Sequence, residues 1–278
     1  GGRKGLEAAR AISLISYRSF DGYNLTQYET DEDCLFASRA ASYERYQGEK
    51  LVNRGFDAYS YYYLLWCVDS QNVGRHRGGV ANALAQTWNT ELMREIGNAI
   101  YREMKEYGCT YWLAPAVNIH RNPLCGRNFE YFSEDPLISG KMAAALTLGV
   151  QAHPGCGTTI KHYCANNQET NRLVNNSIVS ERALREIYLK GFEIAVKESQ
   201  PWTIMTSYNF INGIHAAENT RLLTDILRGE WGFEGVVMTD WGGGYDDAQI
   251  VRAGNEMIQP GSDERYLKLL GAIKDGSL

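Results

Sequence analysis

Helices and strands are predicted to alternate along most of this chain, from about residue 85 to its last residues. Apolar residues at helical spacing predict helices, and these segments are 84–107, 136–151, 181–194, 219–227, 248–253 and 266–274. Short apolar runs between them predict buried strands at 110–114, 158–160, 203–206, 236–239 and 257–258. Strands that alternate with helices form a parallel sheet that the helices cover.

The predicted fold class is α/β, and within it a (β/α) TIM-like barrel is favoured over a dinucleotide-binding sheet. No Gly-x-Gly-x-x-Gly motif follows an early strand, as a dinucleotide-binding sheet requires. Only about six or seven strands can be counted, so the barrel is expected to be incomplete or irregular. We assign residues 61–278 to the barrel and residues 1–60 to an N-terminal segment of helix and loop.

Composition argues against several classes of partner and cofactor. Hydrophobic residues make up 44% of the 278 residues and charged residues 22%, which is typical of a soluble globular protein. The formal net charge of -5 argues against a nucleic acid or an anionic membrane as partner. No apolar run approaches the roughly 20 residues that span a bilayer, and no signal peptide is visible. The six cysteines form no CxxC pair and the histidines lack metal-ligand spacing, so we expect structural thiols, with a disulfide left open, and no metal or cofactor.

Polar residues follow the predicted strands at the points where the strands end. In a β/α barrel these carboxyl ends meet at one mouth, where catalytic residues lie. Each residue alone has a structural explanation, such as a turn, an ion pair or core packing, but their coincidence at one edge favours a functional site. They are Asp69 after 64–68, Asn118 and Arg127 after 110–114, Lys161 and His162 after 158–160, Ser207, Tyr208 and Asn209 after 203–206, and Asp240 and Trp241 after 236–239.

The residue types at this edge suit sugar chemistry. The carboxylate of Asp240 can attack or stabilise an oxocarbenium-like centre, and the indole of Trp241 can pack on the apolar face of a pyranose ring. Tyr208 can donate a hydrogen bond that orients this carboxylate. The remaining charged and polar residues supply both donors and acceptors for sugar hydroxyls, and they are Asp69, Arg127, Lys161 and His162.

The chain resembles glycoside hydrolase family 3, in its β-glucosidase branch, over roughly residues 80 to 262. The matching motifs occur in family order and with family-like spacing. They are LCGRNFEYFSEDP at 124–136, KHY at 161–163 with NQE at 167–169, SERALRE at 180–186, SYN at 207–209 with ING at 211–213, and TDW at 239–241.

This resemblance implies a β/α-barrel catalytic domain and a role for each matching residue. Asp240 would be the catalytic nucleophile, with Tyr208 beside it and Trp241 flanking the sugar. Four residues would bind the hydroxyls of the non-reducing-end sugar, and two carboxylates, Glu130 and Glu169, would support them. The four are Asp69, Arg127, Lys161 and His162.

The chain departs from the family pattern in two ways. Asp69 is followed by Ser70-Gln71-Asn72, where the family usually shows Asp-Gly-Pro. In addition, the β-glucosidase branch carries its general acid/base, a Glu, on a separate α/β domain that is not visible here. The N-acetylglucosaminidase branch uses a second His close to the Lys-His pair, and this chain has Asn166 and its neighbours there without such a His.

The leading hypothesis is a retaining exo-acting β-glycosidase, most simply a β-glucosidase, whose partners are a β-glucoside or oligosaccharide substrate and a second α/β domain or chain that carries the acid/base Glu. The alternative is a carbohydrate-binding domain or pseudo-enzyme that lacks its own acid/base. A third hypothesis, from another class, is a Schiff-base aldolase with Lys161 as nucleophile.

Overall fold

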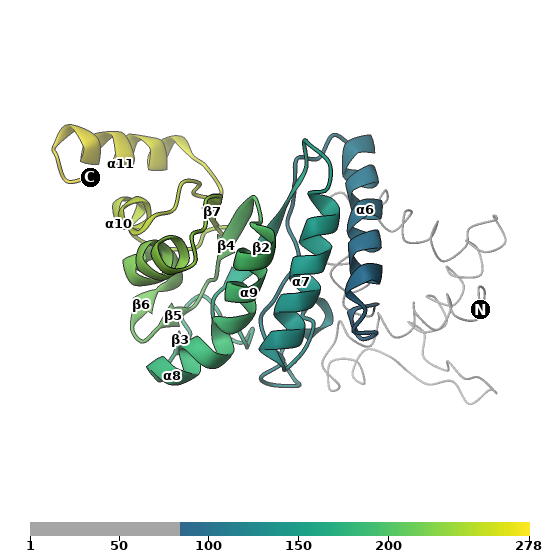
Figure 1. Ribbon diagram of the computed structural model, residues 1–278. Coiled ribbons are helices and arrows are strands. Elements are labelled where there is room, and N and C mark those ends of the chain that lie inside the picture. The colour runs from purple at the N-terminus through teal and green to yellow at the C-terminus, as the bar shows by residue number, and fades with distance from the viewer. Residues whose placement is uncertain (1–83) are drawn as a thin grey trace, which may run out of the picture.

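The computed structural model describes residues 84–278 as a parallel sheet flanked by helices (Figure 1). The sheet in this part of the chain has the order β1-β2-β4-β7, and all three pairings are parallel. Its strands are β1 (Tyr111–Trp112), β2 (Gly157–Tyr163), β4 (Thr203–Thr206) and β7 (Val236–Thr239). Parallel strands in sequence order with helical crossovers are the arrangement of a β/α barrel wall.

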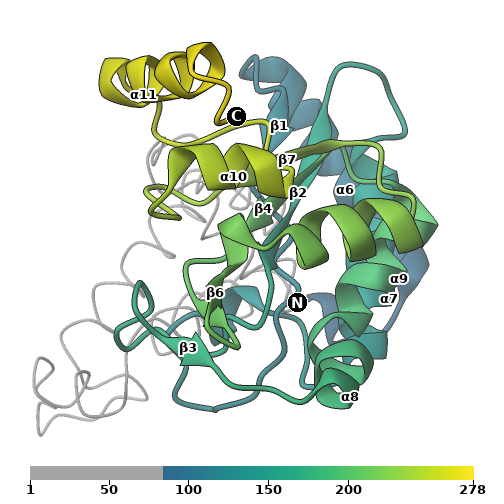
Figure 2. The same ribbon diagram turned by 90° about the vertical axis from the view of Figure 1, so that its left-hand side faces the viewer.

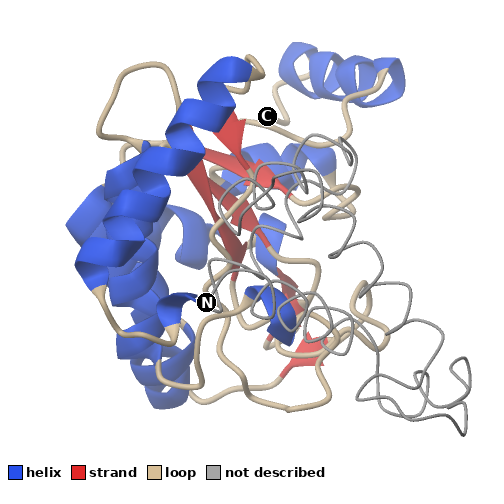
Figure 3. Ribbon diagram, turned by 90° about the vertical axis from the view of Figure 1, so that its right-hand side faces the viewer, coloured by secondary structure: helices blue, strands red, loops and turns tan. Residues whose placement is uncertain are grey.

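Most helices lie on one side of this sheet. Figure 2 shows α6 (Thr90–Glu106), α7 (Pro136–Val150) and α9 (Lys190–Ser199) together beside the strands, and Figure 3 shows the same separation of helices and strands. The remaining elements are α8 (Glu181–Ala183), the π-helical segments η2 (Leu184–Tyr188) and η4 (Arg221–Glu230), the short helices η1 (Asn128–Glu130) and η3 (Ala216–Glu218), and α10 (Asp247–Ala253) and α11 (Asp263–Lys274).

Side-chain caps explain where several helices begin. The Asn89 side chain accepts hydrogen bonds from two backbone N–H groups of the first turn of α6. The Asp135 side chain accepts one such bond, from the Leu137 N–H, at the start of α7, where Pro136 occupies the first helical position. Ser180 accepts from the Ala183 N–H at the start of α8, as the sequence predicts. The predicted helix from residue 84 is too long at its N-terminal end, because Trp88 has a left-handed φ of 55° and the cap follows it.

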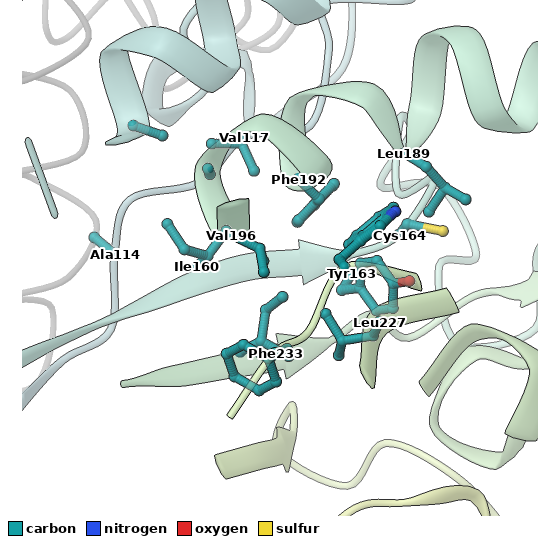
Figure 4. Close-up of a cluster of buried hydrophobic side chains, with 14 of the residues drawn as sticks. Ala114, Val117, Ile160, Tyr163, Cys164, Leu189, Phe192, Val196, Leu227 and Phe233 are labelled. Carbon is teal, nitrogen blue, oxygen red and sulfur yellow. The ribbon is translucent and has the colours of Figure 1, made fainter. Parts of the chain in front are cut away.

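The core forms where α9 packs on β2 (Figure 4). Phe192 and Val196 of α9 face Ile160 and Tyr163 of β2, and all four are 0% exposed. The rings of Tyr163 and Phe192 meet edge to face at 5.3 Å between centroids. The buried Tyr163 hydroxyl donates to the Leu222 carbonyl at 3.0 Å, so this core has a polar tie to η4. This packing fixes the position of β2 relative to α9, and with it the position of the residues at the end of β2.

A second, three-stranded sheet of order β3-β5-β6 lies beyond the carboxyl ends of the main strands and was not predicted. It consists of β3 (Asn176–Ser177), β5 (Phe210–Ile211) and β6 (Ile214–His215). Two-residue strands carry no periodicity, so sequence patterns cannot reveal them. The predicted strand at 257–258 is present only as a single bridge between Met257 and Met238.

Candidate active site

Asp240 follows β7 directly, and the two oxygens of its carboxylate have different surroundings. Oδ1 accepts hydrogen bonds from the Tyr208 hydroxyl at 3.0 Å and from the Trp241 backbone N–H at 2.8 Å. Oδ2 lies 3.8 Å from Nε2 of His162. The residue is only 8% exposed. One oxygen is therefore held by two donors, while the other faces the imidazole across a gap wider than a hydrogen bond.

An asparagine fixes the orientation of His162. The Asn118 side chain accepts from the His162 backbone N–H at 2.7 Å and donates to the His162 carbonyl at 2.9 Å. These two bonds determine which end of the amide is the oxygen, and that oxygen lies 3.3 Å from Nδ1 of the ring. Because a carbonyl oxygen can only accept, Nδ1 carries a proton and Nε2 is the nitrogen that faces Asp240.

Lys161 and His162 are consecutive residues of β2, although the sequence predicts that they follow the strand. In a regular strand, neighbouring side chains point to opposite faces. Here the pairing of β2 with β4 shifts its register between Ile160 and Tyr163, and such irregularities redirect side chains near functional sites. The shift accounts for two neighbouring polar residues at one end of the sheet.

Glu130 is a buried carboxylate between two buried cations. Its side chain pairs with Arg127 Nε through one oxygen and lies 3.2 Å from Lys161 Nζ through the other. Burial alone would raise the pKa of Glu130, but the two cations hold that pKa below its usual value. Burial lowers the pKa of Lys161, and Glu130 opposes this effect. The carboxylate thus keeps both cations in place at the same edge of the sheet.

The structure brings together most of the residues that the sequence assigns to a site. Contacts link Arg127 to Glu130, Glu130 to Lys161, His162 to Asp240 and Asp240 to Tyr208. Trp241 is 50% exposed beside the buried carboxylate. Asp69 and the whole of the predicted segment 1–60 lie outside the described residues.

Sequence patterns gave no structural role to two further residues of this region. The sequence predicts Asn118 at a strand end, but the strand pattern carries no sign of the two hydrogen bonds that hold His162. Arg172 was missed entirely, although its guanidinium lies over the Tyr208 ring and pairs with Glu169 at 2.7 Å. Both residues act through contacts between distant segments, so local spacing carries no signal for them.

Residues 84–278 contain no group of three or more His, Cys, Asp or Glu side chains arranged to hold a metal ion. Cys109, Cys125, Cys156 and Cys164 are free thiols in this part of the chain. None of the helices that the structure describes is both long enough and apolar enough to cross a bilayer.

Comparison with known proteins identifies the family. The chain matches the glycosyl hydrolase family 3 N terminal domain over residues 64–263. It is 48% identical over 211 residues to beta-glucosidase B of Emericella nidulans, across 73% of this chain and 25% of that protein. It is 49% identical over 198 residues to an exo-alpha-(1->6)-L-arabinopyranosidase of Bifidobacterium longum, across 70% of this chain and 26% of that protein.

A solved structure gives the same result. Beta-glucosidase 3B from Thermotoga neapolitana in complex with glucose is 54% identical, with a TM-score of 0.69 over 71% of this chain and 28% of that one. The predicted family resemblance and the α/β fold with a parallel sheet are therefore confirmed. The chain spans about a quarter of the length of the curated relatives named above.

Proposed function

This chain belongs to glycoside hydrolase family 3 and contains its N-terminal (β/α) barrel domain, and from this premise we propose that it acts as a retaining exo-β-glycosidase, specifically a β-glucosidase. The observation that carries the proposal is the asymmetric environment of the Asp240 carboxylate. Oδ1 is held by Tyr208 and by the Trp241 backbone, while Oδ2 is turned toward His162 at the barrel mouth. An oriented, nearly buried carboxylate of this kind is the group that a retaining mechanism needs.

In the proposed reaction, Asp240 Oδ2 attacks the anomeric carbon as the bond to the leaving oxygen breaks. A general acid protonates the leaving oxygen, and the product of this step is a glycosyl-enzyme ester. A water molecule then attacks the same carbon, its proton passes to the same group acting as base, and the electron pair of the ester bond returns to Asp240.

The acid/base Glu is expected on a second α/β domain or another chain. The two carboxylates of the described region that the sequence singles out already have cationic partners. Glu130 pairs with Arg127 and Lys161, and Glu169 pairs with Arg172. Glu130, which two cations hold ionised, is a poor proton donor to a leaving group, and both oxygens of Glu169 already accept hydrogen bonds, from Arg172 and Asn166.

The proposed sugar pocket is made of buried charged groups and one exposed indole. Arg127, Lys161 and His162 would bind hydroxyls of a glucosyl unit, with Asp69 completing the set from outside the described residues. Trp241, half exposed next to the nucleophile, would pack on a sugar face. Hydrogen bonds from charged side chains to hydroxyl groups are among the stronger ones in proteins, which favours binding of a polyhydroxylated ligand here.

Covalent labelling tests the proposal. The protein at its full natural length is incubated with 2,4-dinitrophenyl 2-deoxy-2-fluoro-β-D-glucoside, and the labelled peptide is identified by mass spectrometry. We expect one label on Asp240 and none in the Asp240→Ala variant. Label on another carboxylate would overturn the assignment of the nucleophile, and glucose binding without any turnover or labelling would favour the carbohydrate-binding alternative.

The relative from Bifidobacterium longum, which is named an exo-alpha-(1->6)-L-arabinopyranosidase, suggests a second candidate substrate. An α-L-arabinopyranoside lacks the hydroxymethyl group of a β-D-glucoside and has the opposite configuration at C4. The ratio of kcat/KM for the p-nitrophenyl β-D-glucoside and the p-nitrophenyl α-L-arabinopyranoside separates the two candidates, and we expect the glucoside to be the better substrate. Family membership argues against the aldolase hypothesis for Lys161.

A further inference from the structure

Arg172 lies against the tyrosine that contacts the proposed nucleophile. The guanidinium carbon is 4.6 Å from the centroid of the Tyr208 ring, which is within the range of a cation–π interaction. The hydroxyl of the same ring donates to Asp240 Oδ1 at 3.0 Å. Tyr208 is 6% exposed and Asp240 8%, so water screens this contact only weakly.

The far end of the Arg172 guanidinium is anchored. Nη1 lies 2.7 Å from Glu169 Oε2, and the other oxygen of Glu169 accepts from the Asn166 side chain at 2.9 Å. Asn166 is 1% exposed and also donates to the Tyr131 hydroxyl at 3.2 Å. A planar guanidinium fixed at one edge by a carboxylate keeps a defined orientation over an aromatic ring, which a flexible ammonium group does not.

Two acceptors compete for the single hydrogen of the Tyr208 hydroxyl. It lies 3.0 Å from Asp240 Oδ1 and 2.9 Å from the Trp241 carbonyl oxygen, and a phenol has one hydrogen to donate. A small displacement of the ring would move the hydrogen from the carboxylate to the carbonyl. A cation over the ring both limits this displacement and makes the phenol a stronger donor to an anion.

The segment that carries Arg172 is also tied to the segment that follows the nucleophile. The Tyr245 hydroxyl donates to the backbone carbonyl of Leu173 at 2.8 Å, across 72 positions of the sequence. Residues 166–175 therefore reach 240–245 directly, through Tyr245 to Leu173, and indirectly, through Arg172 over Tyr208 and the Tyr208 hydroxyl to Asp240. Two connections between the same segments restrict the movement of one relative to the other.

We propose that Arg172 is a positioning residue for the nucleophile, which holds the Tyr208 hydroxyl on Asp240 Oδ1 while Oδ2 reacts. The inference rests on the proposed function and deepens it. Negative charge returns to the Asp240 carboxylate when the glycosyl-enzyme is hydrolysed, so a hydrogen bond to Oδ1 is worth most in that step. Arg172 thus acts on the second step through Tyr208, without being a catalytic residue itself.

A double-mutant cycle tests this inference in the protein at its full natural length. The variants are Arg172→Gln, Tyr208→Phe and the double variant. The substrate is the dinitrophenyl glucoside or the dinitrophenyl arabinopyranoside, whichever the unmodified protein hydrolyses faster. We expect Arg172→Gln to lower kcat about tenfold and to lower KM with it, so that kcat/KM, which reports the first step, changes little. In the Tyr208→Phe background the same substitution should have less than a twofold effect, because the hydroxyl that it positions is gone.

Two further variants and one measurement complete the design. Arg172→Lys keeps the charge without the planar group and should recover part of the lost kcat. Arg182→Gln removes an arginine whose side chain is 84% exposed and which, among the described residues, pairs with Glu186 four positions along the chain, so it serves as the control that leaves kcat unchanged. Melting temperatures of all variants show that each one is folded.

Several outcomes would overturn the inference. Equal effects of Arg172→Gln in both backgrounds would mean that Arg172 acts independently of Tyr208, and a rise in KM alone would mean that it binds substrate directly. An Arg172→Gln variant as active as the Arg182→Gln control would also overturn it. If the unmodified protein formed no glycosyl-enzyme at all, the proposed function would fail, and this result is distinct from each of the others.

Discussion

Glu130 holds two cations of the candidate site at once, and its own pKa is lowered for this reason. Removal of one partner from a buried ion cluster leaves the others without compensation for their lost hydration. The side chain of Glu130 is 0% exposed, that of Lys161 7% and that of Arg127 11%. The triad therefore depends on Glu130 for its stability, and the positions of both cations depend on it too.

We predict that Glu130→Gln destabilises the protein by about 3–5 kcal/mol, because Arg127 and Lys161 then lack a buried counter-ion. Urea unfolding followed by circular dichroism measures the change. Glu186→Gln, which removes an exposed carboxylate from a surface pair with Arg182, is the control and should change stability by less than about 1 kcal/mol. A similar, small effect of both substitutions would show that the triad contributes little.

His215 presents both of its ring nitrogens to backbone donors. Nδ1 lies 3.1 Å from the Ala217 N–H and Nε2 lies 3.2 Å from the Gly244 N–H, in the segment after Asp240. A neutral imidazole has one nitrogen that can accept, and a protonated one has none. Burial lowers the pKa of His215, while the neighbouring Glu218 opposes that shift. Only the neutral ring can accept here, and it accepts one of the two hydrogen bonds at a time.

The lowered pKa gives a signed prediction for stability against pH. Because the folded state binds a proton on His215 less readily than the unfolded state, the free energy of unfolding has its full value above the unfolded pKa of about 6.5. It decreases as the pH falls from there through the lower pKa of the folded state. The slope is at most about 1.4 kcal/mol per pH unit between the two values. Urea unfolding at pH 7.5, 6.5 and 5.5 should show this slope in the unmodified protein and a smaller one in His215→Gln. The matched control is His153→Gln, the same substitution at an exposed histidine.

At the scale of elements, α6 and α7 are in close contact because each has a glycine at their crossing. A Cβ atom added at Gly97 would lie 2.8 Å from the Gly149 Cα and closer still to the Leu146 carbonyl. A Cβ at Gly149 would meet the Gly97 Cα at 2.8 Å in return. Backbone atoms cannot move aside as a flexible side chain can, so the two helices would have to separate.

We predict that Gly97→Ala lowers the free energy of unfolding by about 1–3 kcal/mol through overpacking, although alanine is the better helix former. The matched control is Gly271→Ala in α11, where the added Cβ meets nothing within 4 Å and the residue is exposed. That variant should gain about 0.5–1 kcal/mol. Opposite signs for two identical substitutions in helices would establish packing as the cause, and equal signs would refute it.

Elements with a clear period or an unbroken apolar run could be predicted from the sequence, and the others could not. The strands β4 and β7 have the predicted bounds, because each is a short apolar run enclosed by turn residues. The helix 181–194 was predicted as one continuous helix, yet it contains the π-helical segment η2, which depends on local hydrogen bonding that leaves no trace in hydropathy. In the second sheet, β3 pairs with β5 some 30 positions away, which a local pattern cannot show, and β5 and β6 form a hairpin whose strands are too short to have a period.

At the scale of the whole molecule, the candidate site could be predicted because barrel topology brings strand ends together. Lys161, Tyr208 and Asp240 come from three different strand ends: Tyr208 donates to Asp240, and His162, the neighbour of Lys161 in β2, faces the same carboxylate. Two loop residues orient this set, Asn118 at His162 and Arg172 at Tyr208. Their contacts join distant segments, so they depend on the tertiary structure and not on a local sequence pattern. The sequence thus gives the residues that face the mouth, and the structure gives their orientation.

The same scale decides what residues 1–278 can do alone. They contain the proposed nucleophile and most of the proposed sugar pocket, whereas the acid/base is expected on a separate α/β domain. General acid catalysis is typically worth about 10²–10⁴-fold, so cellobiose, whose leaving group needs a proton, should be hydrolysed slower by roughly this factor than by the protein at its full natural length. The dinitrophenolate of a dinitrophenyl glucoside leaves without a proton, so the first step with this substrate should be slowed far less. Azide should partly restore the second step, because it attacks the glycosyl-enzyme without base assistance.

The measurement is kcat/KM for both substrates, with circular dichroism as evidence that residues 1–278 fold. Cellobiose turnover equal to that of the full-length protein would place the acid/base within residues 1–278, and Glu130→Gln and Glu169→Gln would then be the first variants to examine.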